Sequence, residues 1–222
     1  MPKKPFTPDQ VASQRERIMD MSAQVMSEVG FHHLSMRKLA SELGMTASNI
    51  YNYFPNKESL LLSVRHRGFE IAFRDINNAI LGASDARSAF YQFTRQLFVF
   101  AYQQPGYYQL MFQPPKLPLE NISYSDRRLA TVVDRFLSEW QQQAAGILSD
   151  AIPQLLEQSE VFRRQIVLGY LATTHGLIDL FIRNSIPDIT GENNLIADEM
   201  IRAQVDFLYE TLESRARKEY MG

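Results

Sequence analysis

The chain contains no cysteine among its 222 residues. Thiol nucleophiles, thiolate metal sites and structural disulfides are therefore excluded, and such a composition is natural in a reducing cytoplasm. Glycine and proline are also scarce, at ten residues each, and they gather at a few breaks. Between these breaks the apolar residues recur at three- and four-residue steps instead of alternating, which predicts an all-α protein.

Long apolar runs are missing as well. No apolar stretch follows the two lysines near the N-terminus, so we expect no signal peptide. The apolar, uncharged stretch at residues 165–178 is shorter than the roughly 20 apolar residues that a membrane span needs. From these two absences we predict a soluble, cytoplasmic protein with no membrane partner.

Motifs of common enzyme classes are absent too. The sequence has no nucleophile elbow, no phosphate-binding glycine loop and no dinucleotide-binding glycine pattern. None of the four histidines follows a glutamate at the three-residue spacing of helical di-iron sites. We therefore expect no catalytic residue, no metal site and no cofactor.

Charge is distributed unevenly along the chain. Residues 1–67 carry nine Lys and Arg against six Asp and Glu, whereas the remainder carries 14 against 19. A mildly basic head on an acidic body is compatible with contact between the head and nucleic acid, and ordinary scatter of charge explains it equally well. We expect two domains, a helix-turn-helix domain over residues 8–67 and a ligand-binding and dimerisation domain over residues 68–222.

Caps and breaks divide the chain into helices. Ser35 and Thr46 can each cap a short helix, Gly30 and Gly44 end the helices before them, and Pro55 ends the third. The predicted helices span residues 8–29, 36–43, 47–54, 57–81, 85–103, 107–112, 126–152, 155–184 and 193–218, and residues 113–125 form a proline-rich loop.

Residues 35–54 have the layout of a helix-turn-helix, with two short helices joined by a tight turn that contains glycine. The spacing alone also fits ordinary helical domains, so the chemistry of the outward positions carries the argument. Those positions are donors for phosphates and base edges, namely Arg37, Lys38, Ser48, Asn49, Asn52, Tyr53 and Lys57.

These residues resemble a known family. The runs Gly30-Phe31, SMRKLA at 35–40, LGMTASNIY at 43–51, YFPNKE at 53–58 and Leu60-Leu61 look like the N-terminal domain of TetR/AcrR-family transcriptional regulators. The run FAYQQPGYYQLMF at 100–112 and the later THGL at 174–177 resemble the sensor half of one branch of that family.

The resemblance implies a homodimer that binds a double-stranded DNA operator and a small-molecule inducer. The third helix of each chain enters the major groove, where Ala47, Ser48 and Asn49 face base edges and Arg37 reaches a guanine or a phosphate. Tyr51, Tyr53 and Lys57 bind the DNA backbone. Ser35, Thr46 and Asn52 complete the set of expected DNA contacts. Ser35 and Thr46 can instead be helix caps, and Asn52 can simply be solvated. Tyr51 can equally be part of the core.

The same resemblance implies a ligand pocket in the middle helices and an intersubunit bundle of the last two. The expected pocket is apolar with a few polar anchors, and His175 reads either as a ligand contact or as a buried structural histidine. Its expected lining is Tyr102, Tyr107, Tyr108, Met111, Phe112, Phe136, Trp140, Tyr170 and His175. Apolar residues form one stripe on each of the last two predicted helices, and such stripes suit either an interface or the chain's own core. The first stripe is Ile166, Tyr170, Leu177 and Phe181, and the second is Ile201, Val205, Leu208 and Leu212.

Together these features predict a ligand-responsive DNA-binding regulator, a repressor released from its operator by a small apolar or aromatic molecule. The alternative is a helical small-molecule-binding adaptor, or an enzyme, that does not bind DNA. An adaptor does not need Arg37 or Lys57. Neutralising both residues and measuring DNA binding therefore separates a regulator from an adaptor.

Overall fold

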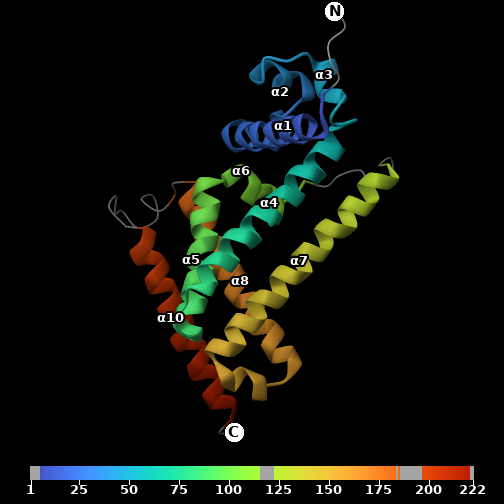
Figure 1. Cartoon of the computed structure of the whole chain (residues 1–222). Coiled ribbons are helices and arrows are strands. Elements are labelled where there is room, and N and C mark those ends of the chain that lie inside the picture. The colour runs from blue at the N-terminus through green and yellow to red at the C-terminus, as the bar shows by residue number, and fades with distance from the viewer. Residues whose placement is uncertain (1–5, 116–122, 184, 186–196, 221–222) are drawn as a thin grey trace, which may run out of the picture. The chain divides into compact units, whose positions relative to one another are not determined.

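Every regular element in the described part of the chain is a helix. The computed structural model describes residues 6–115, 123–183, 185 and 197–220. In chain order the elements are α1 (Pro8–Val29), η1 (Phe31–His33), α2 (Met36–Glu42), α3 (Ala47–Tyr51), α4 (Lys57–Leu81), α5 (Ala86–Gln103), α6 (Pro105–Phe112), α7 (Tyr124–Ala151), η3 (Pro153–Glu157), α8 (Glu160–Ile182) and α10 (Ala197–Tyr220). The all-α prediction is confirmed (Figure 1).

Internal contacts divide the chain into two compact units. The first unit comprises residues 1–70 and 104–134, and the second comprises residues 71–103 and 135–222. Helices α4 and α7 each run through both units. The predicted division into a helix-turn-helix domain at residues 8–67 and a ligand-binding and dimerisation domain at residues 68–222 stays a prediction.

Local sequence signals explain where α1 begins and ends. The Thr7 hydroxyl accepts from the backbone N–H of Gln10, and the Gln10 side chain accepts in return from the backbone N–H of Thr7. Pro8 occupies the first turn, where its missing N–H costs nothing. Gly30 ends the helix at φ +81°, a conformation that other residues rarely adopt.

The other predicted helices agree with the structure to within about two residues, except in two places. The prediction of a helix to Phe54 is wrong, because α3 ends at Tyr51. The prediction of one helix from residue 155 is wrong as well, because η3 precedes α8 and Ser159 caps α8 by accepting from the N–H of Phe162. The predicted ends at residues 184 and 193 lie outside the described residues.

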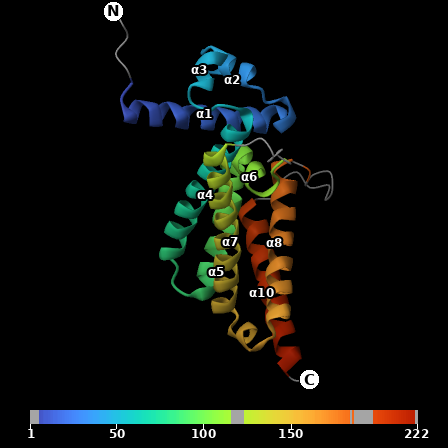
Figure 2. The same ribbon diagram turned by 90° about the vertical axis from the view of Figure 1, so that its right-hand side faces the viewer.

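The core of the second unit combines aliphatic side chains with packed aromatic rings. Helices α5, α8 and α10 lie side by side in this unit (Figures 1 and 2). The ring of Phe93 lies 4.9 Å from that of Trp140, and the ring of Phe90 lies 5.2 Å from that of Tyr170. Of the two predicted stripes, Ile166, Tyr170, Ile201, Val205 and Leu208 are buried in the chain's own core, and the side chain of Leu212 lies outside the described part.

One described helix, α8, is long and apolar enough to cross a membrane by length and composition. Its most apolar window has a mean hydropathy of 1.3, and 28% of that window is buried within the chain. A single helix of this kind is weak evidence for a membrane span, because helices that pack in protein interiors pass the same test.

Candidate DNA-binding surface and sensor residues

The helix-turn-helix is built from two capped short helices. The hydroxyl of Ser35 accepts from the backbone N–H of Lys38 at 3.1 Å and starts α2. The hydroxyl of Thr46 accepts from the N–H of Asn49 at 3.2 Å and starts α3. Between them Gly44 adopts φ +63°, which lets the chain reverse within three residues. Ser35 and Thr46 therefore act as caps in this structure, and their contact with DNA stays a prediction.

The two short helices separate an apolar face from a polar face. Met36, Leu39, Ala40 and Ile50 are buried against the rest of the first unit. The opposite face exposes Arg37, Ser48, Asn49, Tyr51 and Asn52, and leaves Ala47 and Tyr53 partly exposed. Tyr51 is 49% exposed, so core packing does not explain it. The outer face thus offers cationic, hydroxyl and amide groups within one short span of chain.

Arg15 of α1 holds the end of α3, a role that the sequence pattern does not reveal. Its guanidinium donates to the backbone carbonyl of Tyr53 and lies 4.2 Å from the centre of the Phe54 ring. Burial lowers the pKa of Arg15 from its ordinary value. The residue lies off the apolar stripe of α1 and looks like a solvated charge. Its partners are 38 and 39 residues away, beyond the reach of helical periodicity.

Lys57 lies in the first turn of α4, where the sequence predicts a phosphate contact. Its ammonium donates to the carbonyl of Phe31 at 3.3 Å and lies 4.4 Å from the centre of that ring. Burial lowers the pKa of Lys57, and the neighbouring Glu58 opposes that shift. Lys57 thus ties α4 to η1, and its contact with a phosphate stays a prediction.

The expected ligand residues fall into both units. Tyr107, Tyr108, Met111 and Phe112 belong to α6 in the first unit. Tyr102, Phe136, Trp140, Tyr170 and His175 belong to the second. The structure therefore does not bring all nine residues into one pocket, and the contacts of each unit's residues are described below.

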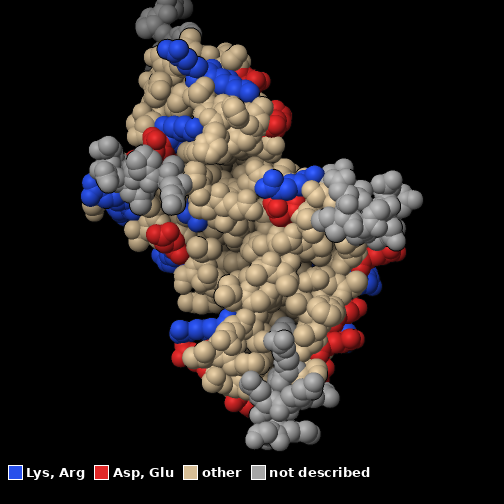
Figure 3. All heavy atoms as spheres, turned by 180° about the vertical axis from the view of Figure 1, so that it is seen from behind, with Lys and Arg blue, Asp and Glu red and all other residues tan. Residues whose placement is uncertain are grey.

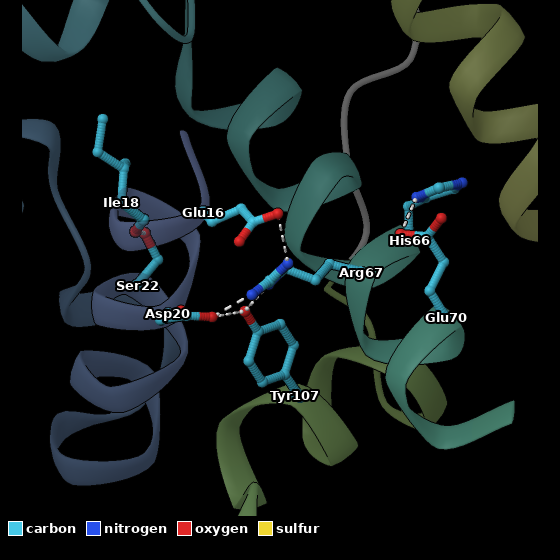
Figure 4. Close-up of polar contacts among 8 residues, drawn as sticks. All are labelled: Glu16, Ile18, Asp20, Ser22, His66, Arg67, Glu70 and Tyr107. Carbon is cyan, nitrogen blue, oxygen red and sulfur yellow. Dashed lines mark hydrogen bonds and ion pairs between the residues drawn. The ribbon is translucent and has the colours of Figure 1, made fainter. Parts of the chain in front are cut away.

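In the first unit, Tyr107 belongs to a polar network that joins α1, α4 and α6 (Figure 4). Its hydroxyl donates to Oδ1 of Asp20 at 2.6 Å. Nε of Arg67 donates to the same carboxylate oxygen at 3.1 Å and to the Tyr107 hydroxyl at 3.2 Å. Glu16 lies 3.3 Å from the same guanidinium. Burial raises the pKa of Tyr107, so its hydroxyl stays protonated and donates.

Gly106 makes the approach of α6 to α1 exceptionally close. A Cβ atom at this position would lie 1.9 Å from the carbonyl oxygen of Ala23 in α1. Backbone cannot move away as the tip of a side chain can, so only glycine fits there. The first turn of α6 is thereby fixed on α1, the helix that also carries Arg15.

In the second unit, Trp140 and Tyr170 are core residues. Both are about 1% exposed. The hydroxyls of Tyr170 and Thr94 lie 2.7 Å apart, and burial raises the pKa of Tyr170. Phe136 lies 5.6 Å from Phe73 by ring centres. Tyr102, in contrast, is 78% exposed at the end of α5.

His175 of α8 is only partly exposed to solvent. Burial lowers the pKa of His175 to about 4, so its imidazole is neutral near pH 7. A neutral imidazole still offers one donor and one acceptor. No group of three potential metal-ligating side chains occurs among the side chains that the structure describes.

Comparison with known proteins points to one family. Residues 18–64 match the model of bacterial regulatory proteins of the tetR family. An uncharacterized HTH-type transcriptional regulator of Haemophilus influenzae is 28% identical over 103 residues, which cover 46% of this chain and 55% of that protein. The transcriptional repressor KstR of Mycolicibacterium smegmatis is 36% identical over 56 residues, which cover 25% of this chain and 28% of the repressor. The chain thus spans about half or less of the length of these curated relatives.

The fold extends the likeness over most of the chain. A crystal structure of AibR in complex with isovaleryl coenzyme A and operator DNA superposes with a TM-score of 0.64 and 14% identity. The match covers 89% of this chain and 97% of AibR. At this identity the superposition shows a shared fold. It confirms the all-helical architecture with an N-terminal helix-turn-helix.

Proposed function

Because residues 18–64 match the tetR-family model and the fold matches that of AibR, we propose that the chain is a transcriptional regulator of the TetR family. We propose further that it is a cytoplasmic repressor, released from a DNA operator by a small molecule. One observation carries this proposal. The helices α2 and α3 are buried on one side and present Arg37, Ser48 and Asn49 on the other. The exposed set has no role in the packing of the first unit, so recognition is the function that accounts for it.

We assign the readout of bases to the first turn of α3. The Asn49 side chain can donate to and accept from an adenine edge, Ser48 can hydrogen-bond to any base, and the methyl group of Ala47 suits a thymine methyl. Arg37 of α2 lies on the same exposed face and reaches a guanine or a phosphate. Tyr51, Tyr53 and Lys57 bind the phosphate backbone and set the register on the duplex.

The repressor acts as a homodimer through α8 and α10. Most of the apolar window of α8 is uncovered within one chain, and Val161 and Leu168 are each 67% exposed. Phe207 of α10 is 64% exposed. In the second unit, the surface seen in Figure 3 carries few charged side chains across its middle. A second copy of the chain would cover this surface, as an operator with two half-sites requires.

The inducer acts through α6 and α4. Tyr107 and Gly106 fix α6 to α1, and α4 continues without a break from Lys57 beside the DNA-binding helices into the second unit. A ligand that shifts α6 or the far end of α4 therefore changes the spacing of the two α3 helices in a dimer. Half-sites read from one face of DNA lie about 34–36 Å apart, so a change of a few ångströms disfavours binding.

KstR is named as a repressor, and AibR is found with both an acyl coenzyme A and operator DNA. These names support repression and ligand response here as proposals. We expect the inducer to be small and apolar or aromatic, since the buried core of the second unit combines aliphatic side chains with aromatic ones such as Phe93, Trp140 and Tyr170. No catalytic role is proposed, and the regulators that resemble this chain are not enzymes.

A binding assay tests the proposal. A fluorescent duplex, selected from random sequences with the full-length protein, is titrated with wild type, Arg37→Ala and Arg74→Ala. Arg74 is an exposed arginine of α4 in the second unit and is a control for the loss of one positive charge. We expect Arg37→Ala to weaken binding at least about tenfold and Arg74→Ala to leave it unchanged. Failure to select any duplex, or equal effects of the two variants, would contradict the proposal and favour the adaptor.

Assembly is tested by light scattering. We expect a mass twice the chain's 25.6 kDa for wild type, and dissociation to a single chain for Leu168→Asp, because an aspartate cannot be buried unpaired. A wild-type mass of one chain at micromolar concentration would contradict the dimer.

A further inference from the structure

A cavity of about 350 Å³ lies between α5, α8 and α10 in the second unit. Its walls are apolar, with Phe98 and Val99 from α5, Ile178 and Phe181 from α8, and Ile201 from α10. This volume is in the range of pockets that hold small organic molecules. Of the nine ligand residues expected from the sequence, only Tyr102 lines this cavity, so it is separate from the aromatic cluster around Trp140.

The cavity has one charged end. Nε of Arg95 donates to Oδ1 of Asp198 at 2.9 Å. The other oxygen of Asp198 lies 3.9 Å from the guanidinium of Arg202, one turn further along α10. Two arginines therefore share one carboxylate. Within the described part of the chain, the terminal nitrogens of Arg95 have no acceptor.

This arrangement favours a carboxylate guest. A guanidinium binds carboxylates through two parallel N–H groups, and Asp198 uses only the Nε side of Arg95. A cationic guest would find the one carboxylate already shared by two arginines. An apolar tail would then lie against Phe98 and Phe181, where it leaves water for an aromatic wall.

We propose that this cavity binds a small organic acid with an aromatic or branched apolar tail, whose carboxylate pairs with Arg95. The carboxylate competes with Asp198 and thereby loosens the first turn of α10 from α5. The regulatory meaning of the site rests on the proposed function, because α10 belongs to the proposed dimer surface. The binding step needs no DNA and is tested on the free protein.

The same two helices provide a matched control. Nη2 of Arg87 donates to Oδ1 of Asp206 at 3.1 Å, also between α5 and α10, and neither residue lines the cavity. Arg87→Gln therefore removes the same charge and the same kind of interhelix ion pair. It keeps Arg95 and the cavity walls intact.

Calorimetric titration with two probes of one shape decides the chemistry. Phenylbutyrate carries the proposed carboxylate, and phenylbutylamine has the same aromatic tail with a positive charge. We expect saturable binding of one phenylbutyrate per chain and at least about tenfold weaker binding of the amine. Equal affinities, or no saturable binding of phenylbutyrate to the folded protein, would overturn the proposal.

Substitutions then locate the site. Arg95→Gln should weaken phenylbutyrate binding at least about tenfold, and Arg87→Gln should leave it unchanged. Asp198→Asn should tighten it by about threefold, because the competing carboxylate is gone. Val99→Phe, which fills the cavity from an incompletely buried position, should abolish binding while the helical circular dichroism stays the same. Equal losses in Arg95→Gln and Arg87→Gln, or weaker binding by Asp198→Asn, would contradict the assignment.

Operator binding, measured with and without phenylbutyrate, separates the two proposals. A protein that binds the acid but no DNA would retain this site and refute the proposed function. A protein that binds DNA but not the acid would support the proposed function and refute this ligand site.

Discussion

The two units of this chain are organised by different kinds of interaction. In the first unit, short-range contacts define the helices: one hydroxyl starts α2, another starts α3, and Gly44 makes the turn between them. In the second unit, long helices pack through side chains that are distant in the sequence, including aromatic pairs such as Phe93 with Trp140 and Phe90 with Tyr170. Caps and a glycine turn fix the backbone over a few residues, whereas a hydrophobic core tolerates many combinations of side chains. This difference suggests that function is easier to read from the first unit than from the second.

The largest expected effect is at the contact between α6 and α1. Gly106→Ala places a methyl group 1.9 Å from the Ala23 carbonyl oxygen in the present backbone, so α6 must move or the unit must unfold. We expect a loss of about 3 kcal/mol in the free energy of unfolding, measured by urea denaturation. Gly146→Ala is the control, because nothing lies within 4 Å of a Cβ there and alanine favours the helix. Equal stability of the two variants would show that α6 is not held by this contact.

The next effect concerns base recognition by the first unit. Asn49→Ala removes the amide proposed to read an adenine, and we expect about 1–3 kcal/mol weaker binding to the selected duplex. Binding to non-specific DNA should change little, since phosphate contacts remain. Anisotropy titrations against both duplexes measure the two values. An equal loss on both would reassign Asn49 to the backbone.

A third effect belongs to the second unit and appears only in acid. The folded state holds His175 with a pKa of about 4, whereas the ordinary value is about 6.5. The unfolded chain therefore binds the proton first, and the stabilisation present above pH 6.5 is lost as the pH falls toward 4. We expect His175→Asn to reduce the loss of stability between pH 7 and 4.5 by about 1–2 kcal/mol. Parallel pH profiles for both proteins would contradict the buried neutral state.

A smaller effect is expected at the polar network of the first unit. Tyr107→Phe removes one hydrogen bond to Asp20, but Arg67 still donates to that carboxylate. We expect a loss of about 1 kcal/mol in unfolding free energy. If the network also transmits ligand binding, the variant should weaken induction more than it weakens operator affinity. Unchanged induction would confine Tyr107 to a structural role.

The smallest effect is on the salt dependence of DNA binding. Each neutralised phosphate contributes about −0.9 to the slope of log affinity against log salt concentration. Lys57→Ala should flatten that slope, and Lys57→Arg should preserve it. Because Lys57 also donates to the Phe31 carbonyl, thermal melting of both variants shows whether folding changed. If Lys57→Ala leaves the slope unchanged, Lys57 does not contact a phosphate, and its role is limited to the contact with Phe31.

Sequence patterns predicted most of the first unit because caps and glycines act within a few residues. They predicted the end of α3 three residues too late, because the apolar spacing continues to Phe54 although the helix ends at Tyr51. They missed Arg15, whose partners lie far along the chain. In the second unit, an aromatic residue in a helix looks the same whether it is packed, like Trp140, or exposed, like Tyr102. The cavity near Arg95 depends on how α5, α8 and α10 pack together, which a local sequence pattern cannot predict.

The account depends most on the claim that the outer face of α2 and α3 reads DNA. Selection of duplexes from a random pool, followed by sequencing, tests it with wild type and Asn49→Ala side by side. The account predicts an inverted repeat for wild type and a loss of preference at one symmetric pair of positions for Asn49→Ala. The same repeat with unchanged preference in both proteins would contradict readout by this face, and no enrichment by wild type would contradict DNA binding itself.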